Sequence, residues 1–224
     1  MIRKVLITAG PTREMLDPIR FISNRSTGEM GYALAKACKK AGYRVTLVSG
    51  PTALTPPRGI RYIPITNTAE LQKACGRFFP THDALIMSAA VSDYRPRKTS
   101  RTKMARAGKL KLTLEPTPDI VAGLAKRKGR RLVIGFCLET QDWLRRAKKK
   151  CVQKGLDGIV ANQLSPKHNP FGKGAVRMAL VTAGNGPHSQ RVLPRQSKNI
   201  LARAIIQWMD LLSKKGYRST QKRI

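Results

Sequence analysis

The sequence predicts an α/β fold, in which helices cover both faces of a doubly wound, mainly parallel sheet. Short runs rich in β-branched and other apolar residues alternate with longer segments whose apolar residues recur at helical spacing. The first two of these runs end in Gly10-Pro11 and Gly50-Pro51, as strands that feed loops do. The 224 residues, 41% hydrophobic and 25% charged, suit one large α/β domain or two small ones.

The first part of the chain gives the clearest alternation. The expected elements are a strand at 4–9, a long loop at 11–27, a helix at 28–40, strands at 44–49 and 59–65, a helix at 69–79 and a strand at 84–90. Ser26 and Thr27 are candidate caps of the first helix, and Thr66 or Thr68 of the second.

The pattern changes between residues 95 and 116. Pro96, a basic run and the alternation of Leu110, Leu112 and Leu114 predict a β-arm, formed by two strands or by an edge strand. A Rossmann-like sheet with such an excursion is therefore expected.

The strand–helix alternation resumes after the arm. We expect a helix at 118–128 capped by Thr117, a strand at 132–136, a helix at 141–154, a strand at 158–161, a closing antiparallel edge at 175–182 and 191–193, and a last helix at 197–215. These elements are assigned to a single domain, residues 1–216, with a polar tail at 217–224.

The charge balance is strongly basic. There are 44 Lys and Arg against 12 Asp and Glu, a net charge of +32 that implies polyanionic partners, either nucleic acid or phosphorylated small molecules. A solvated basic face explains the charge equally well. The basic stretch 95–131 has only Tyr94, just outside it, as an aromatic residue, so the stacking residues of a single-strand binder are missing.

Several other classes of protein are disfavoured. No apolar run approaches the ~20 residues of a membrane span, and no signal peptide is recognisable, so we expect a soluble, cytoplasmic protein without membrane contact. The cysteines, at 38, 75, 137 and 151, lack metal-knuckle or redox spacing and are expected to be buried apolar residues. The histidines, at 82, 168 and 188, are expected on the surface or in loops.

Ligands of doubly wound sheets bind outside the carboxyl ends of the strands, which directs attention to the loops after them. The loop from Ser23 to Gly31 brings hydroxyls, an amide and glycines to a helix N-terminus, the make-up of an anion cradle. It matches neither the Walker A nor the dinucleotide fingerprint, and a plain capped helix is the alternative. The acids Glu14, Asp17, Asp93 and Glu139 also fall in these loops.

Other candidates are more ambiguous. Asp93 could hold a metal or a sugar hydroxyl, or form a turn, and small residues at Ala89 and Ala90 leave backbone groups open to a flat base. Lys103 could reach a phosphate, and Asn162 has the same ambiguity as Asp93. Tyr94 and Lys98 have the YxxxK spacing that short-chain reductases place on one face of a helix. Pro96 lies between them and breaks the helix that this pair requires.

Taken together, the motifs resemble those of the phosphopantothenate–cysteine ligase family, over residues 5 to about 206. They are Ile7–Glu14, Asp17–Asn24, Gly28, Met30–Gly31, Thr46–Pro51, Ala89–Tyr94, Pro118–Ile120, Gly135–Phe136, Glu139–Thr140, Ala161–Asn162 and Ser197–Lys198. The resemblance implies a step of coenzyme A biosynthesis, in which CTP with Mg²⁺ activates the carboxylate of 4′-phosphopantothenate as an acyl-cytidylate. Cysteine then attacks this intermediate and releases CMP. A nucleic-acid-binding protein on a ligase-like scaffold is the alternative that the charge keeps open.

The resemblance also implies roles for particular residues. The implied catalytic residues are Asn24, Lys103 and Arg20; the nucleotide-binding residues are Gly10, Ser26, Gly28, Ala89, Ala90, Asp93 and Phe136; Asn24 and Asn162 would bind substrate, and Asp93 the metal. Family members are dimers, so the arm at 95–116 is expected to cross to a partner of a homodimer, and residues 162–174 are expected to form a flap.

The chain departs from the family pattern at several positions. Glu29 replaces a lysine that opens the first helix, and the lysine-rich motif of the arm keeps only Lys103. Cys137-Leu138 replaces a pair of small residues, and Gly174-Ala175 stands where an asparagine is common. The flavin-dependent decarboxylase domain that precedes this one in many bacteria is not recognised in the sequence.

Overall fold

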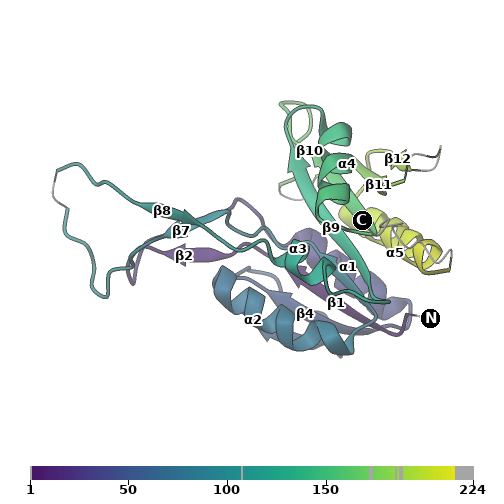
Figure 1. Ribbon diagram of the computed structural model, residues 1–224, viewed down its shortest axis with the longest axis horizontal. Helices are drawn as coiled ribbons and strands as arrows, with labels where there is room; N and C mark the ends of the chain where they lie inside the picture. Colours follow the sequence, from purple (N-terminus) through teal and green to yellow (C-terminus); the bar gives the residue numbers. More distant parts are fainter. Residues whose placement is uncertain (1, 107, 172–173, 185, 187–188, 215–224) are drawn as a thin grey trace.

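A single eight-stranded sheet organises the computed structural model, which describes residues 2–106, 108–171, 174–184, 186 and 189–214. Its strands are β1 (Lys4–Ala9), β4 (Arg44–Ser49), β5 (Arg61–Pro64), β6 (Ala84–Met87), β9 (Leu132–Glu139), β10 (Gly158–Gln163), β11 (Met178–Val181) and β12 (Gln190–Val192). Their order is β12-β11-β10-β9-β6-β1-β4-β5 (Figure 1). The strands from β10 to β5 are parallel, and β11 and β12 pair antiparallel at one edge. The expected α/β fold with an antiparallel edge is confirmed.

Helices cover both faces of the sheet. Helices α1 (Glu29–Lys40) and α5 (Lys198–Lys214) pack on one face; α2 (Thr68–Phe78), the 3₁₀ helix η1 (Phe79–Thr81), α3 (Ile120–Ala125) and α4 (Trp143–Gln153) pack on the other. Strand side chains alternate between the faces, so that Val5 and Ile7 join the α1–α5 cluster while Leu6 joins the opposite one. Because both faces are buried, the inner strands β1, β6 and β11 are apolar along most of their length, whereas the edge strands β5 and β12 are largely exposed.

The loop predicted at 11–27 contains a small hairpin, β2 (Arg13–Met15) and β3 (Phe21–Ser23), which the sequence analysis missed. The Glu14 carboxylate accepts hydrogen bonds from the backbone N–H and the hydroxyl of Thr68, at 2.9 and 2.6 Å. The turn is held by Asp17, which accepts from the N–H groups of Ile19 and Arg20. Polar side chains therefore position this hairpin, and its strands are too short to show an apolar alternation.

The arm is a two-stranded antiparallel ribbon, β7 (Tyr94–Pro96) and β8 (Leu114–Pro116), as predicted. It projects away from the sheet, to the left in Figure 1. Leu110, Leu112 and Leu114 are 59%, 44% and 41% exposed. One chain therefore leaves this row of leucines largely uncovered.

Several predicted boundaries and caps are wrong. Strand β6 ends at Met87 rather than at residue 90, and β9 and β10 extend beyond their expected ends to Glu139 and Gln163. Asn67 and Asp119, whose side chains accept from Glu70 and Ala122 N–H groups, cap α2 and α3 in place of the threonines expected. The N-cap of α1 is Gly28 rather than Ser26 or Thr27. Lys215 and the tail at 217–224 lie outside the described residues.

His82 lies in the connection between η1 and β6, one of the two placements expected, but it is buried and not on the surface. Its Nε2 lies 2.8 Å from the Thr46 hydroxyl, and its Nδ1 lies 2.7 Å from the Phe78 carbonyl oxygen. His168 is half-buried in a loop, and His188 lies outside the described residues. Burial lowers the pKa of His82 below its ordinary value of 6.5, because desolvation disfavours the imidazolium.

This lowered pKa predicts a loss of stability in mild acid. Below pH 6.5 the His82 side chain is protonated in the unfolded chain but stays neutral in the folded protein. The free energy of unfolding therefore falls as the pH drops through 6.5. Urea unfolding between pH 5 and 8 measures the slope. In His82→Gln the slope should be smaller, and at pH 8 the variant should be less stable by about 1–2 kcal/mol from its altered hydrogen bonds. If the pH dependence of stability were the same in His82→Gln as in the original protein, His82 would not be its source.

None of the helices within the described residues combines the length and the apolar character that crossing a bilayer requires.

Candidate active site

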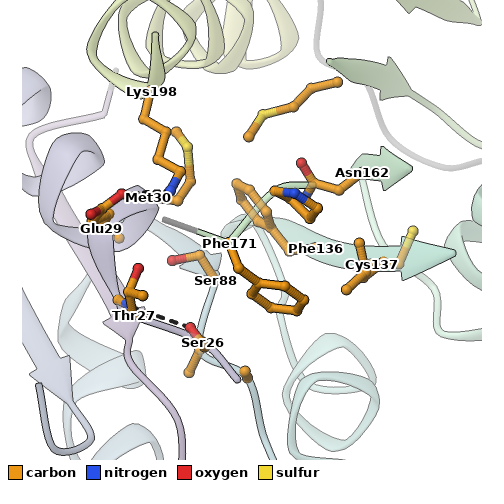
Figure 2. Close-up of a pocket in the computed structure, with 17 residues that line it drawn as sticks. Ser26, Thr27, Glu29, Met30, Ser88, Phe136, Cys137, Asn162, Phe171 and Lys198 are labelled. Carbon is orange, nitrogen blue, oxygen red and sulfur yellow. Dashed lines mark hydrogen bonds and ion pairs between the residues drawn. The ribbon is translucent and has the colours of Figure 1, made fainter. Parts of the chain in front are cut away.

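A cavity of about 180 Å³ lies at the carboxyl ends of the strands, next to the N-terminus of α1 (Figure 2). Its walls come from the loop before α1, from the residues after β6, from β9 to β11, and from the start of α5. They are formed by Ser26, Thr27, Gly28, Glu29, Met30, Gly31, Ser88, Ala89, Ala90, Phe136, Cys137, Leu138, Asn162, Pro170, Phe171, Met178 and Lys198. The cavity thus lies where the rule for doubly wound sheets places a ligand.

The N-terminus of α1 forms one wall of the cavity. Gly28 is left-handed, with φ of 79°, and its N–H donates to the Ser26 hydroxyl at 3.3 Å. No side chain in the described part of the structure caps the helix, which leaves its first N–H groups available to an anion. A Cβ on Gly28 would lie 2.6 Å from the Thr52 methyl and 3.3 Å from the Gly10 Cα. Glycine therefore lets this helix start approach the loop after β1 closely.

Backbone groups of Ala89 and Ala90 form a second wall. The Ala89 N–H donates to the Thr8 hydroxyl at 3.0 Å, and the Ala90 N–H donates to the Gly10 carbonyl at 2.9 Å. The Ala90 carbonyl accepts from the Thr12 N–H at 3.1 Å and from Asn24 Nδ2 at 3.0 Å. Both N–H groups and both lone pairs of the Ala90 carbonyl oxygen are used within the chain, so the Ala89 carbonyl oxygen is the acceptor that this wall can offer a ligand.

The structure brings most of the predicted nucleotide-binding residues together. Ser26, Gly28, Ala89, Ala90 and Phe136 line the cavity, together with Asn162, which was predicted to bind substrate. Gly10 lies directly behind Gly28, and exposed Asn24 reaches the edge of the cavity through its bond to Ala90.

The remaining predicted residues do not line the cavity. Arg20 donates to the carboxylate of Asp17 and to the carbonyl of Met104, at 2.8 Å in each case, so it lies beside the arm segment that carries Lys103. Lys103 and Asp93 are exposed. Within the described residues no group of three or more His, Cys, Asp or Glu side chains could hold a metal ion.

Three of the acids singled out from the sequence are structural. Asp17 is buried, and the Arg20 guanidinium, helped by the backbone N–H groups of Ile19, Arg20 and Met104, holds its pKa well below the usual range. Glu14 anchors the β2–β3 hairpin to α2, as described above. Glu139, the last residue of β9, is buried beside Lys150 at 2.6 Å. Only Asp93 retains an exposed carboxylate near the site.

Sequence reasoning missed several lining residues. Ser88, Phe171, Met178, Glu29 and Lys198 were not among the predicted site residues, although Lys198 and Glu29 fall in quoted motifs. Phe171 comes from the predicted flap, and the guanidinium of Arg25 lies 5.0 Å from the centre of its ring. This contact has no local sequence signal, because Arg25 and Phe171 are far apart along the chain.

The cavity also contains a thiol. Desolvation by burial raises the pKa of Cys137 to about 12, so this thiol is protonated at neutral pH and is a poor nucleophile. Cys38, Cys75 and Cys151 are buried, as predicted, and Cys137 is half-buried. The four cysteines are unpaired.

Residues 1–212 match the family described as the DNA/pantothenate metabolism flavoprotein C-terminal domain. The chain belongs to this family. It is 41% identical over 220 residues to the coenzyme A biosynthesis bifunctional protein CoaBC of Bacillus subtilis, covering 97% of this chain and 53% of that protein. It is 35% identical over 207 residues to the protein of the same name from Escherichia coli, covering 90% of this chain and 50% of that one. The chain thus spans about half the length of the curated relatives it matches.

Two solved structures share the fold. The crystal structure of the C-terminal domain of a CoaBC protein has a TM-score of 0.81 and 33% identity, covering 95% of this chain and 96% of that one. A Cab2 variant in complex with phosphopantothenate-cysteine has a TM-score of 0.76 at 18% identity, a likeness of fold alone; it covers 96% of this chain and 87% of that one. Family membership therefore confirms the resemblance seen in the sequence motifs.

Proposed function

We propose that the chain joins cysteine to 4′-phosphopantothenate in coenzyme A biosynthesis, with CTP as the activating nucleotide. The observation that carries this proposal is the cavity in which the uncapped N-terminus of α1 meets Ala89, Ala90, Phe136 and Asn162. Membership of the family and the 41% identity to a coenzyme A biosynthesis protein support it.

The geometry suggests how CTP is held. The triphosphate would lie at the N-terminus of α1, where backbone N–H groups and the helix dipole favour an anion. The cytosine amino group would donate to the carbonyl oxygen of Ala89, and Phe136 would pack near the base. Recognition of an amino group by carbonyl acceptors favours cytosine over a base that presents a carbonyl there.

The proposed reaction has two steps. The phosphopantothenate carboxylate attacks the α-phosphorus of CTP, forming the acyl-cytidylate and releasing pyrophosphate. The cysteine amine then attacks the acyl carbon, forming the amide bond and releasing CMP. Asn24 and Asn162 would orient the carboxylate, while Arg20 and Lys103 would neutralise the charge that develops on phosphate and carboxylate oxygens.

Mg²⁺ would depend mainly on the nucleotide for its ligands. Asp93 is the exposed carboxylate beside the site, and the described residues provide no cluster of protein ligands around it. This donor set fits Mg²⁺, which keeps several waters and binds through one or two carboxylates together with substrate phosphates. Asp93 would hold the ion or the ribose.

The site is proposed to be completed by a second copy of the chain. Lys103 belongs to the arm and Arg20 contacts the arm at Met104, whereas the cavity is lined by other segments. An arm that crosses to the partner of a homodimer would bring Lys103 to the partner's cavity and cover the exposed leucines. The single ligase domain, residues 1–216, is proposed to act in the cytoplasm.

We expect this dimer to become tighter as salt rises. Two copies at +32 repel each other, and salt screens this repulsion over a Debye length of about 8 Å at physiological ionic strength, whereas leucine packing is unaffected. Sedimentation velocity across a salt series measures the dissociation constant. A fully active monomer at every salt concentration would contradict both the dimer and the shared site.

Pyrophosphate release tests the proposed reaction directly. The protein is mixed with Mg²⁺ and CTP or ATP, with phosphopantothenate and cysteine each omitted in turn. If pyrophosphate release requires phosphopantothenate but not cysteine, and is faster with CTP than with ATP, the result supports the two-step reaction with CTP. If no nucleotide is cleaved in any mixture, and a salt-sensitive gel shift with nucleic acid is seen instead, the chain is a nucleic-acid-binding protein.

A further inference from the structure

An ion pair lies at the N-terminus of α1, where the loop from Ser23 to Gly31 forms the proposed anion cradle. Lys198, at the start of α5, donates to the carboxylate of Glu29, the first residue of α1, at 2.6 Å (Figure 2). Both side chains are largely buried, at 11% and 20% exposed. The pair therefore lies in a partly desolvated place, where charges interact more strongly than on an open surface.

This pair lines two cavities at once. Besides the cavity described above, Glu29 and Lys198 line a second cavity of about 320 Å³, whose other walls come from α1, α5 and the segment 54–57. Any anion bound at the N-terminus of α1 would lie close to both charged groups. Glu29 would repel this anion and Lys198 would attract it.

Glu29 also competes with a ligand for the helix terminus itself. A carboxylate in the first turn satisfies the positive end of the helix dipole, which is the same feature that attracts an external anion. The uncapped N–H groups thus face a site that already contains one negative charge. Glu29 therefore lowers the affinity of this site for an anion in two ways. Its own charge repels the anion, and its ion pair with Lys198 offsets the attraction of that lysine.

We propose that Glu29 is an affinity-limiting residue for the polyphosphate part of the nucleotide. This inference rests on the proposed function, since the triphosphate of CTP is the expected occupant of the cradle. The carboxylate keeps the ground-state affinity for CTP and pyrophosphate low, and its loss would strengthen the binding of both.

Glu29→Gln is the decisive variant, because glutamine keeps the shape and a hydrogen-bond acceptor for Lys198 while removing the charge. Titration calorimetry with CTP, and separately with inorganic pyrophosphate, should show binding about three- to tenfold tighter than in the unchanged protein at low salt. Glu29→Lys should tighten binding by about tenfold or more. The KM for CTP should fall in parallel, with little change in kcat.

The salt dependence separates a charge effect from a change in shape. The advantage of Glu29→Gln should shrink as ionic strength rises, because salt screens the repulsion that the variant removes. Glu70→Gln is the matched control: it makes the same change in net charge at an exposed position of α2, on the opposite face of the sheet, and glutamine is accepted at this position of a helix cap. It should leave CTP and pyrophosphate affinity unchanged.

The outcomes distinguish this inference from the proposed function. If CTP binds and is cleaved but Glu29→Gln binds it with unchanged affinity, Glu29 does not limit binding. Weaker CTP binding by Glu29→Gln in the presence of Mg²⁺ would overturn the inference in the opposite direction, by giving the carboxylate a role in holding the metal–nucleotide complex. If neither CTP nor pyrophosphate binds to any variant, both the inference and the proposed function are wrong.

Discussion

Asn24→Ala should lose about 10²-fold in kcat while remaining folded, the scale seen when one donor to a developing charge is removed. Asn24 is exposed, and its amide donates to the carbonyl of Ala90 at the edge of the cavity. Removing it does not strand that carbonyl, because the Thr12 N–H also donates to it. The expected damage therefore concerns the reaction and not the fold. Steady-state kinetics with CTP, phosphopantothenate and cysteine, together with a thermal unfolding curve, measure both.

Asn67→Ala is a matched control for this variant. The Asn67 side chain accepts from the Glu70 N–H at the start of α2, away from the cavity. Its loss should cost about 1 kcal/mol of stability, as expected for a helix cap, and leave kcat unchanged. The two asparagines should thus show opposite patterns. Near-normal kcat in folded Asn24→Ala would remove this residue from the proposed mechanism.

Lys103→Ala should also lose about 10²-fold in kcat, and part of the loss should be recovered by mixing. If the arm of one chain serves the cavity of the other, a mixed dimer of Asn24→Ala and Lys103→Ala has one site with both residues intact. Random pairing of equal amounts then restores about a quarter of the original activity. Co-expression of two differently tagged chains, followed by kinetics on the purified mixture, measures the recovery.

Lys109→Ala is the control for the arm, since it removes an exposed lysine from the same segment. It should keep near-normal kcat. An arm that serves its own chain predicts no recovery in the mixture, because each site would then lack either Asn24 or Lys103. That result, with both single variants inactive, would place the whole site within one subunit.

The central sheet could be predicted from the sequence because its strands are buried on both faces. Such strands are continuous apolar runs, and the helices between them show helical spacing over many residues. The β2–β3 hairpin had no such signal, because buried carboxylates and the turn at Asp17 hold it in place. The same limit explains the caps: Gly28 takes the N-cap of α1 through a left-handed backbone and a close approach to Gly10, which are tertiary features.

The candidate site was predictable where motifs follow strands. Ser26, Gly28, Ala89, Ala90, Phe136 and Asn162 meet in the cavity because parallel strands end at the same edge of the sheet. The ion pair between Glu29 and Lys198, and the contact between Arg25 and Phe171, could not be predicted, since each joins segments distant in sequence. The roles of Glu14 and Glu139 were hidden for the same reason, because their partners Thr68 and Lys150 are brought to them by the fold.

Helix α5 also determines when the site can form during synthesis. Its buried face contributes Leu201, Ala202, Ile205, Ile206 and Met209 to the apolar cluster that covers β1 and α1. A ribosome releases α1 before α5, so the nascent chain exposes this apolar surface until α5 has emerged. Lys198, which lines the cavity, arrives with the same helix. Docking of α5 therefore buries the exposed surface and completes the wall of the cavity in one event, so a nascent chain acquires this cavity only when α5 folds.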